Sequence, residues 1–147
     1  MSETDSSERA SKLPVSQFAF PGPLRDRLVG AILDGRKTTT TSLLAEYEIE
    51  RAPLPREGER SVVVDSTGAP VCVIETVEVR VVGLGDVDDR HVLDEGEGHA
   101  TVSDWRDDHE RYWRGREVVD SLGGSAPVLD DATPVVLERF RVIERLR

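Results

Sequence analysis

The residues best suited to chemistry lie in one short stretch, DGRKTTTTSL, residues 34–43. Here Lys37 directly precedes a run of four threonines and a serine. Lysine is rare in the chain, since 17 of its 19 basic residues are Arg and the two lysines are Lys12 and Lys37. Arg stays protonated at biological pH, whereas a partly buried Lys can lose its proton and act as a base. Lys37 is therefore a candidate for proton chemistry, although a solvated turn explains the same residues equally well.

The threonine run offers hydroxyl groups next to this lysine. In an extended chain the side chains alternate between two faces, so we expect Lys37, Thr39 and Thr41 on one side. Thr40 and Ser42 then point to the other side, unless a bend at the start of the strand brings Thr40 toward Lys37. A hydroxyl becomes a nucleophile when a base lies beside it, and a desolvated Lys can be that base.

An acidic loop, LDEGEGH at residues 93–99, carries Asp94, Glu95 and Glu97 between glycines. A carboxylate on such a loop could orient a lysine or act as a general acid–base. The glycines would let the backbone approach a ligand closely. A solvated acidic loop is the simpler interpretation of this segment alone.

A second carboxyl, Glu75, falls among alternating valines in VCVIETVEV. A carboxylate on an apolar face must be paired or protonated. We expect Glu75 to form a structural ion pair with Arg139 or Arg141, and a catalytic role is the less favoured interpretation.

The segment after the acidic loop carries aromatic residues at helical spacing, which is most simply a core-facing stripe. Trp105 and Arg106 fall in its first turn, where the Trp ring could instead line a cleft and stack on a base. His109 is interpreted as an ordinary packing residue. The spacing of His, Asp and Glu matches no metal motif, so we expect no metal and no cofactor.

Composition limits the classes of function. The chain has 147 residues, enough for one domain with a core. No apolar run approaches the roughly 18 residues of a membrane helix, and no leader opens the sequence, so we expect a cytoplasmic location. The net charge of -10 argues against broad binding of duplex nucleic acid. The single cysteine, Cys72, is expected in a buried strand.

The pattern predicts a disordered tail over residues 1–13 and a single domain over 14–147. The expected elements are a helix at 21–37, an extended threonine run, a short helix or loop at 43–59, a hairpin at 60–82, a short helix within 84–98, a helix at 101–124 and a strand at 133–146. Helices and strands do not alternate regularly, so the fold class is α+β. We expect a small β-barrel with helices packed around it.

Taken together, these motifs resemble the ASCH domain, a PUA-like small β-barrel. The resemblance covers roughly residues 18–145 and rests on the G-x-K-x-x-T motif at 35–40, the EGEG loop at 95–98 and the Trp-Arg helix that follows. It implies a cleft that faces RNA or a nucleoside. Some members of the family are described as ribonucleases acting on single-stranded RNA, and small bacterial members as amidohydrolases of N4-acetylcytidine.

The resemblance also implies residue roles. By position, the catalytic set is Lys37, Thr40 and Glu97, with Glu95 and Glu75 as alternatives for the acid. The residues expected to contact the substrate are Arg36, Thr41, Ser42, Tyr47, Trp105 and Arg106. The expected function is a hydrolase of RNA or of a nucleoside; the alternative is a non-catalytic reader of RNA or modified nucleotides.

Overall fold

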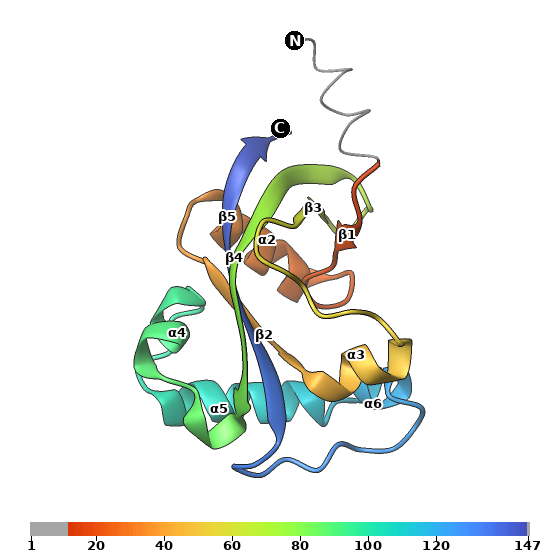
Figure 1. The fold of residues 1–147 in the computed structure, drawn as a ribbon, viewed down its shortest axis with the longest axis vertical. Helices are drawn as coiled ribbons and strands as arrows, with labels where there is room; N and C mark the ends of the chain where they lie inside the picture. The colour runs from red at the N-terminus through yellow and green to blue at the C-terminus, as the bar shows by residue number, and fades with distance from the viewer. Residues whose placement is uncertain (1–11, 147) are drawn as a thin grey trace.

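The computed structural model describes residues 12–146, and Figure 1 shows its fold. The elements in chain order are β1 (Val15–Ser16), α2 (Pro23–Leu33), β2 (Thr39–Leu43), α3 (Leu44–Glu50), β3 (Arg60–Val64), β4 (Pro70–Gly83), the 3-10 helix η1 (Leu84–Asp86), α4 (Asp89–Asp94), α5 (Val102–Trp113), α6 (Arg116–Ser121) and β5 (Pro134–Arg145). The chain is therefore α+β, as the sequence predicted. The tail expected at residues 1–13 lies outside the described residues as far as residue 11.

The five strands form one mixed sheet in the order β1–β3–β4–β5–β2. β1 pairs with β3 in parallel, and the other neighbours are antiparallel. In the described part of the chain no pairing joins the two edge strands, β1 and β2, so the sheet is not closed into a barrel. The barrel expected from the sequence is not confirmed. A closed barrel needs a continuous hydrogen-bonded ladder between its edges, and β1 has two residues with which to supply it.

The predicted hairpin is present as β3 and β4. Its turn includes Gly68, whose φ of 84° glycine adopts without steric cost. Cys72 lies on β4 and is buried and free, as expected. β4 then continues beside β5 along most of their lengths, and this long pair forms the centre of the sheet. The predicted structural role of Glu75 is confirmed, because its Oε2 accepts hydrogen bonds from Arg141 at 2.6 and 3.0 Å.

The single helix expected at 101–124 is two helices in the structure. α5 begins where Thr101 accepts a hydrogen bond from the backbone of Asp104, which is the predicted cap. The chain then leaves the helix after Trp113, and α6 starts beyond Gly115. Glycine is a poor helix interior residue, so a break at this point is consistent with the sequence.

Helices α3 to α6 gather around one end of the long β4–β5 pair, and α2 lies toward the other end (Figure 1). Two clusters of buried apolar side chains support these two parts. One is built around Trp105 and Trp113, and the other packs Phe18, Val29 and Ile32 with β3, β4 and β5. Within the described residues, no helix is both long enough and apolar enough to cross a membrane.

Candidate functional site

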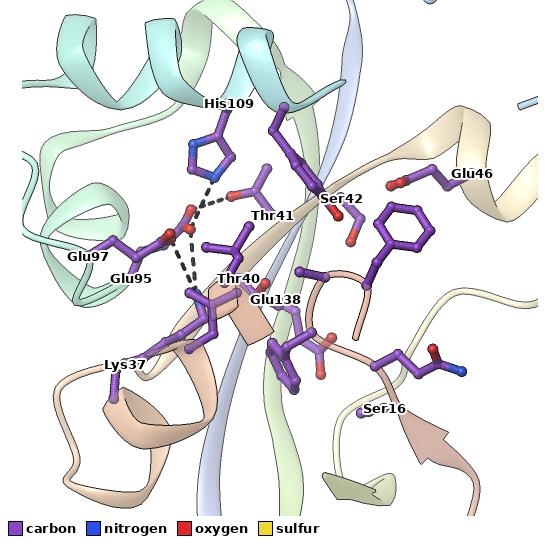
Figure 2. Close-up of a pocket in the computed structure, with 18 of the residues that line it drawn as sticks. Ser16, Lys37, Thr40, Thr41, Ser42, Glu46, Glu95, Glu97, His109 and Glu138 are labelled. Atoms are coloured by element: carbon purple, nitrogen blue, oxygen red, sulfur yellow. Dashed lines mark hydrogen bonds and ion pairs between the residues drawn. The ribbon is translucent and has the colours of Figure 1, made fainter. Parts of the chain in front are cut away.

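A cavity of about 1380 Å³ opens between the loop before α2, β2, α3 and the acidic loop after α4. Its walls include six side chains labelled in Figure 2: Lys37, Thr40, Ser42, Glu46, Glu97 and Glu138. Three of the positions expected to be catalytic, Lys37, Thr40 and Glu97, therefore face one cavity although they come from separate segments.

Lys37 is buried, with 2% of its surface exposed. Its Nζ donates a hydrogen bond to the carbonyl of Thr39 at 2.8 Å. The same nitrogen lies 3.5 Å from Glu95 Oε1 and 3.6 Å from Glu97 Oε2 (Figure 2). A buried charge is tolerated when it is paired, and two carboxylates supply that pairing here. Lys37 is thus part of an internal charge cluster, and the interpretation as a solvated turn is excluded.

The acidic loop is docked directly on the backbone that carries Lys37. The amide of Thr38 donates to the carbonyl of Asp94 at 2.8 Å. Gly96 has a φ of 69°, and a Cβ at this position would lie 2.3 Å from the carbonyl oxygen of Arg36. We expected the glycines of this loop to let the backbone approach a ligand. Gly96 instead allows a close approach to the chain's own backbone, and this contact brings both acids to the lysine.

Glu95 is the centre of the cluster, and both of its oxygens are occupied. Oε2 accepts hydrogen bonds from Thr41 Oγ1 at 2.6 Å and from Trp105 Nε1 at 2.8 Å. Oε1 faces Lys37 and, at 3.2 Å, His109 Nε2. Burial opposes ionisation of Glu95, but the charge of Lys37 and the close contacts with His109 and His91 outweigh it and hold its pKa well below the ordinary value. Glu95 is therefore a fixed anion that positions other groups.

The hydrogen-bond partners of the two histidines in the cluster indicate which of their ring nitrogens carry protons. His109 Nδ1 donates to the carbonyl of Trp105 at 2.9 Å, and its Nε2 faces the carboxylate of Glu95. Burial lowers the pKa of His109, but the hydrogen bond and charge of Glu95 outweigh burial and raise it. His91 Nε2 lies 2.8 Å from Thr41 Oγ1, which donates its own proton to Glu95. His91 therefore donates to Thr41, and the chain of donors ends on Glu95.

Glu97 differs from Glu95 in being partly exposed, with 22% of its side chain accessible. Burial raises its pKa, Lys37 lowers it, and the nearby negative charge of Glu95 raises it again, so that the net shift is upward. A carboxyl that contacts Lys37, faces the cavity and gains a proton readily is suited to proton transfer. Of the three acids left open by the sequence, Glu75 is in a structural ion pair and Glu95 is a fixed anion, and Glu97 has the properties of an acid–base group.

The residues expected to contact a substrate divide into two groups. Ser42 and Tyr47 line the cavity, and burial raises the pKa of Tyr47 to about 12, so its phenol is neutral. Thr41 also borders the cavity, but its hydroxyl is bound to Glu95.

Trp105 is completely buried, and its ring stacks on His109 with centroids 4.2 Å apart. It is not available to stack on a base, contrary to our expectation, because its indole nitrogen is fixed by Glu95. Arg106 turns away from the cavity and pairs with Glu110 and Asp131. The guanidinium of Arg36 is exposed and pairs with Asp34.

Glu95, Glu97 and His109 place ligand atoms within 4.8 Å of one another, an arrangement able to hold a metal ion. The sequence spacing predicted no metal here, because these residues are brought together by the docking of the loop on α5. The ammonium group of Lys37 already contacts both carboxylates. A cation at this position would have to share them with Lys37 at close range, and like charges repel.

Sequence reasoning missed three of the groups that shape the site. His91 was missed although it stands four residues before Glu95, the spacing that places two side chains on one helical face. This spacing could have identified His91 as a partner of Glu95. His109 was assigned to packing because its carboxylate partner is not adjacent in sequence. Glu138 was missed because it reaches the cavity through the pairing of β5 with β2.

The fold and the site together define an α+β domain with a buried lysine–carboxylate cluster at the wall of a cavity large enough for a small ligand. The chain matches the family model of the ASCH domain over residues 16–144, and it belongs to the ASCH domain family. The resemblance drawn from the sequence motifs is thereby confirmed.

Solved structures show the same fold. One is the ASCH domain from Lactobacillus crispatus JV V101, with a TM-score of 0.77 and 26% identity over 96% of this chain and 86% of that one. Another is a protein from Enterococcus faecalis V583, with a TM-score of 0.77 and 24% identity over 90% of this chain and 78% of that one. A comparison with curated proteins finds no match.

Proposed function

We propose that the protein is a hydrolase of N4-acylated cytosine nucleosides, with N4-acetylcytidine as the model substrate. The observation that carries this proposal is the buried Lys37, held between two carboxylates of opposite pKa tendency and facing the same cavity as Thr40. This is the set of groups that a hydroxyl nucleophile requires: a base, a proton acceptor for that base, and a fixed charge that orients both.

The first half of the reaction is acyl transfer to the enzyme. Glu97 takes a proton from the ammonium of Lys37 and leaves a neutral amine. This amine removes the proton of Thr40 Oγ1 as the oxygen attacks the acyl carbon. The tetrahedral intermediate then expels the N4 amine of the base, which takes a proton from Lys37. The products of this half are the free cytosine nucleoside and an acetyl ester on Thr40.

The second half returns the enzyme to its starting state. The Lys37 amine deprotonates a water molecule, which attacks the ester carbonyl. The intermediate releases acetic acid, which loses its proton to solvent as acetate, and the Thr40 oxygen recovers a proton from Lys37. Glu97 then returns its proton to the Lys37 amine, which restores the ammonium and the carboxylate. Glu95 takes no proton in either half, because its low pKa and its occupied oxygens make it a positioning residue for Lys37 and His109.

The charge of the cavity favours a nucleoside over a polynucleotide. Its acidic lining residues are Asp26, Glu46, Glu50, Glu59, Glu95, Glu97, Asp108 and Glu138. Its Lys and Arg lining residues are Arg27, Arg36, Lys37 and Arg111. Binding of an RNA strand depends on neutralising its phosphates with such basic side chains. An acid-rich cavity in a chain of net charge -10 supports a ligand without a row of phosphates.

The test is turnover of N4-acetylcytidine and, separately, of unstructured RNA, with and without divalent cations. Hydrolysis of N4-acetylcytidine by the unmodified protein is expected. Cleavage of RNA instead would indicate a ribonuclease, and binding without turnover of either substrate would indicate a reader.

Lys37→Arg should lower kcat by at least about a hundredfold, since Arg keeps the charge but cannot serve as the base. Lys12→Arg is the matched control, because Lys12 is exposed and lies outside the cavity lining, and it should retain full activity. Thr40→Val, which removes the hydroxyl at nearly constant volume, should be as inactive as Lys37→Arg. Substantial turnover by either site variant, folded as judged by circular dichroism, would contradict the mechanism.

A further inference from the structure

A second buried carboxyl faces the candidate nucleophile from the neighbouring strand. Glu138 of β5 is the direct cross-strand partner of Thr40 of β2. Residues paired in this way point to the same face of the sheet, with Cβ atoms roughly 4.5–5.5 Å apart. Both residues line the cavity, and Figure 2 shows the Glu138 carboxyl among the side chains that surround it. Any ligand that reaches Thr40 therefore comes close to Glu138.

Glu138 is held on one side and open on the other. Its Oε2 accepts a hydrogen bond from Thr76 Oγ1 at 2.8 Å, and an irregularity in β4 between Thr76 and Glu78 accompanies this contact. No residue between 12 and 146 donates a hydrogen bond to Oε1. The carboxyl thus has a fixed orientation, Oε1 is free to contact a ligand, and Oε2 keeps a second lone pair beside the one that accepts from Thr76.

No cation pairs with Glu138 in the described part of the chain, in contrast to Glu95. The adjacent Arg139 pairs instead with Asp94, at 2.9 Å. The titratable groups that face Glu138 are Glu59 and Tyr47, the latter on α3. Burial raises the pKa of Glu138, the Thr76 hydrogen bond opposes this, and Glu59 raises it further. Two more acids of α3, Glu46 and Glu50, also line the cavity and offer no compensating charge.

We propose that Glu138 binds the hydrogen-bonding edge of the substrate's heterocyclic ring and so places the exocyclic acylamino group over Thr40. This inference rests on the proposed function for the role of Thr40. A protonated carboxyl presents a donor and an acceptor side by side. The N3 acceptor and N4–H donor of a cytosine ring form the complementary pair, and two parallel hydrogen bonds fix both position and orientation. Glu138 is a specificity-determining residue in this arrangement.

Tyr47 and Ser42 extend the same wall. Burial raises the pKa of Tyr47 to about 12, although Ser42 lowers it, so the Tyr47 hydroxyl is neutral. Neutral hydroxyls and a carboxyl whose pKa is raised by burial provide polar contacts to an uncharged ring without a charged partner. An anionic ligand group would instead face Glu46, Glu50 and Glu59.

The experiment is calorimetric binding of cytidine, which requires no turnover and so separates this inference from the proposed hydrolysis. Unmodified protein should bind cytidine at pH 7, and Glu138→Ala should weaken binding by about tenfold to a hundredfold, the loss of hydrogen bonds to a buried group. Glu138→Gln should bind within about threefold of the unmodified protein, because an amide also presents a donor beside an acceptor. Glu57→Gln is the control: Glu57 is exposed and lies outside the cavity lining, so this variant should bind normally.

Two further readouts distinguish ring recognition from a structural role. N4,N4-dimethylcytidine, which lacks the N4–H, should bind the unmodified protein about tenfold more weakly than cytidine, and Glu138→Ala should not distinguish the two. Affinity for cytidine should fall as pH rises through the pKa of Glu138 in the unmodified protein and stay flat in Glu138→Gln.

Equal cytidine binding by Glu138→Ala and the unmodified protein would overturn the inference, even if N4-acetylcytidine is hydrolysed. Equal losses in the Ala and Gln variants would also overturn it, and so would absence of cytidine binding by the unmodified protein. Binding that depends on Glu138 as described would support it, even if no hydrolysis is detected.

Discussion

Two buried carboxyl groups of the site, Glu95 and Glu138, differ in what they contact. Glu95 is fully buried and receives donors from two side chains while it faces Lys37 and His109. Glu138 receives a single hydroxyl donor and no cation from the described residues. Burial with a cation gives a permanent anion, whereas burial without one gives a carboxyl that favours its neutral form.

This difference separates a carboxylate that supports the structure of the site, Glu95, from a carboxyl that is able to contact a ligand, Glu138. A carboxylate with both oxygens occupied can hold the residues around it but has nothing left to offer a substrate. A carboxyl that accepts a single hydrogen bond from the protein can bind a ligand and contributes less to the fold. Glu97, which contacts Lys37 and is partly exposed, lies between these two cases.

The largest effect should come from removing the carboxylate of Glu95. Glu95→Ala leaves Lys37 and His109 without their shared anion and should lower the free energy of unfolding by about 3–5 kcal/mol. The measurement is urea unfolding at neutral pH, with Glu138→Ala as the comparison. If Glu138→Ala destabilises the protein as much as Glu95→Ala does, this distinction between Glu95 and Glu138 is wrong.

The contributions of Glu95 and Glu138 to stability should also respond to pH with opposite signs. The pKa of Glu95 is depressed, so its contribution to stability is present above its ordinary value of 4.5 and is lost as pH falls through the folded-state pKa. Glu95→Gln should therefore flatten the loss of stability in acid, as measured by unfolding at a series of pH values between about 2 and 5. If the free energy of unfolding of this variant falls with acid as steeply as that of the unmodified protein, other groups dominate acid unfolding.

For Glu138 the shift is upward, so its contribution is present at low pH and is lost as pH rises through the folded-state pKa. Glu138→Gln should remove this component. Relative to the unmodified protein, the variant should therefore gain more stability at pH 8 than at pH 5. The effect should be smaller than that of Glu95, because Glu138 has no ion pair to lose. Thermal unfolding of both proteins at the two pH values checks it.

The smallest effect should be that of salt on ligand binding. Each phosphate contact contributes about 0.9 to the slope of log affinity against log salt, and a nucleoside has no phosphate. Cytidine affinity should therefore change less than about twofold between 50 and 200 mM salt. Cytidine should also displace a bound RNA oligomer in a competition titration. A steep salt dependence without such competition would place the ligand-binding surface elsewhere.

Local patterns predicted the parts of the site that are close in sequence. Lys37 at the end of a helix, the alternation of Thr39 and Thr41, and the acidic glycine loop were all visible in the sequence, and the structure brings them together. The sequence did not show which of Glu95 and Glu97 is the acid–base group, because these two residues of one loop differ in burial through contacts with α5. The burial of Trp105 was likewise decided by tertiary packing.

Features that depend on pairing between distant strands could not be predicted. Glu138 meets Thr40 because β5 joins β2 across nearly a hundred residues of sequence. Strand order also decided whether the sheet closes, and the hydrophobic pattern of each strand is compatible with an open sheet or a barrel. The elements themselves were largely predicted because turn residues and periodicity act locally, apart from the break at Gly115.

The burial of Lys37 has a practical consequence for covalent labelling. The chain has two lysine side chains; that of Lys12 is exposed, whereas that of Lys37 is buried and bound to Thr39 and two acids. A lysine-directed acylating reagent should modify Lys12 and spare Lys37, so a fluorophore or surface linker attached there would leave the cavity unmodified. Peptide mapping by mass spectrometry after such a reaction would also report whether Lys37 becomes reachable when the acidic loop is displaced.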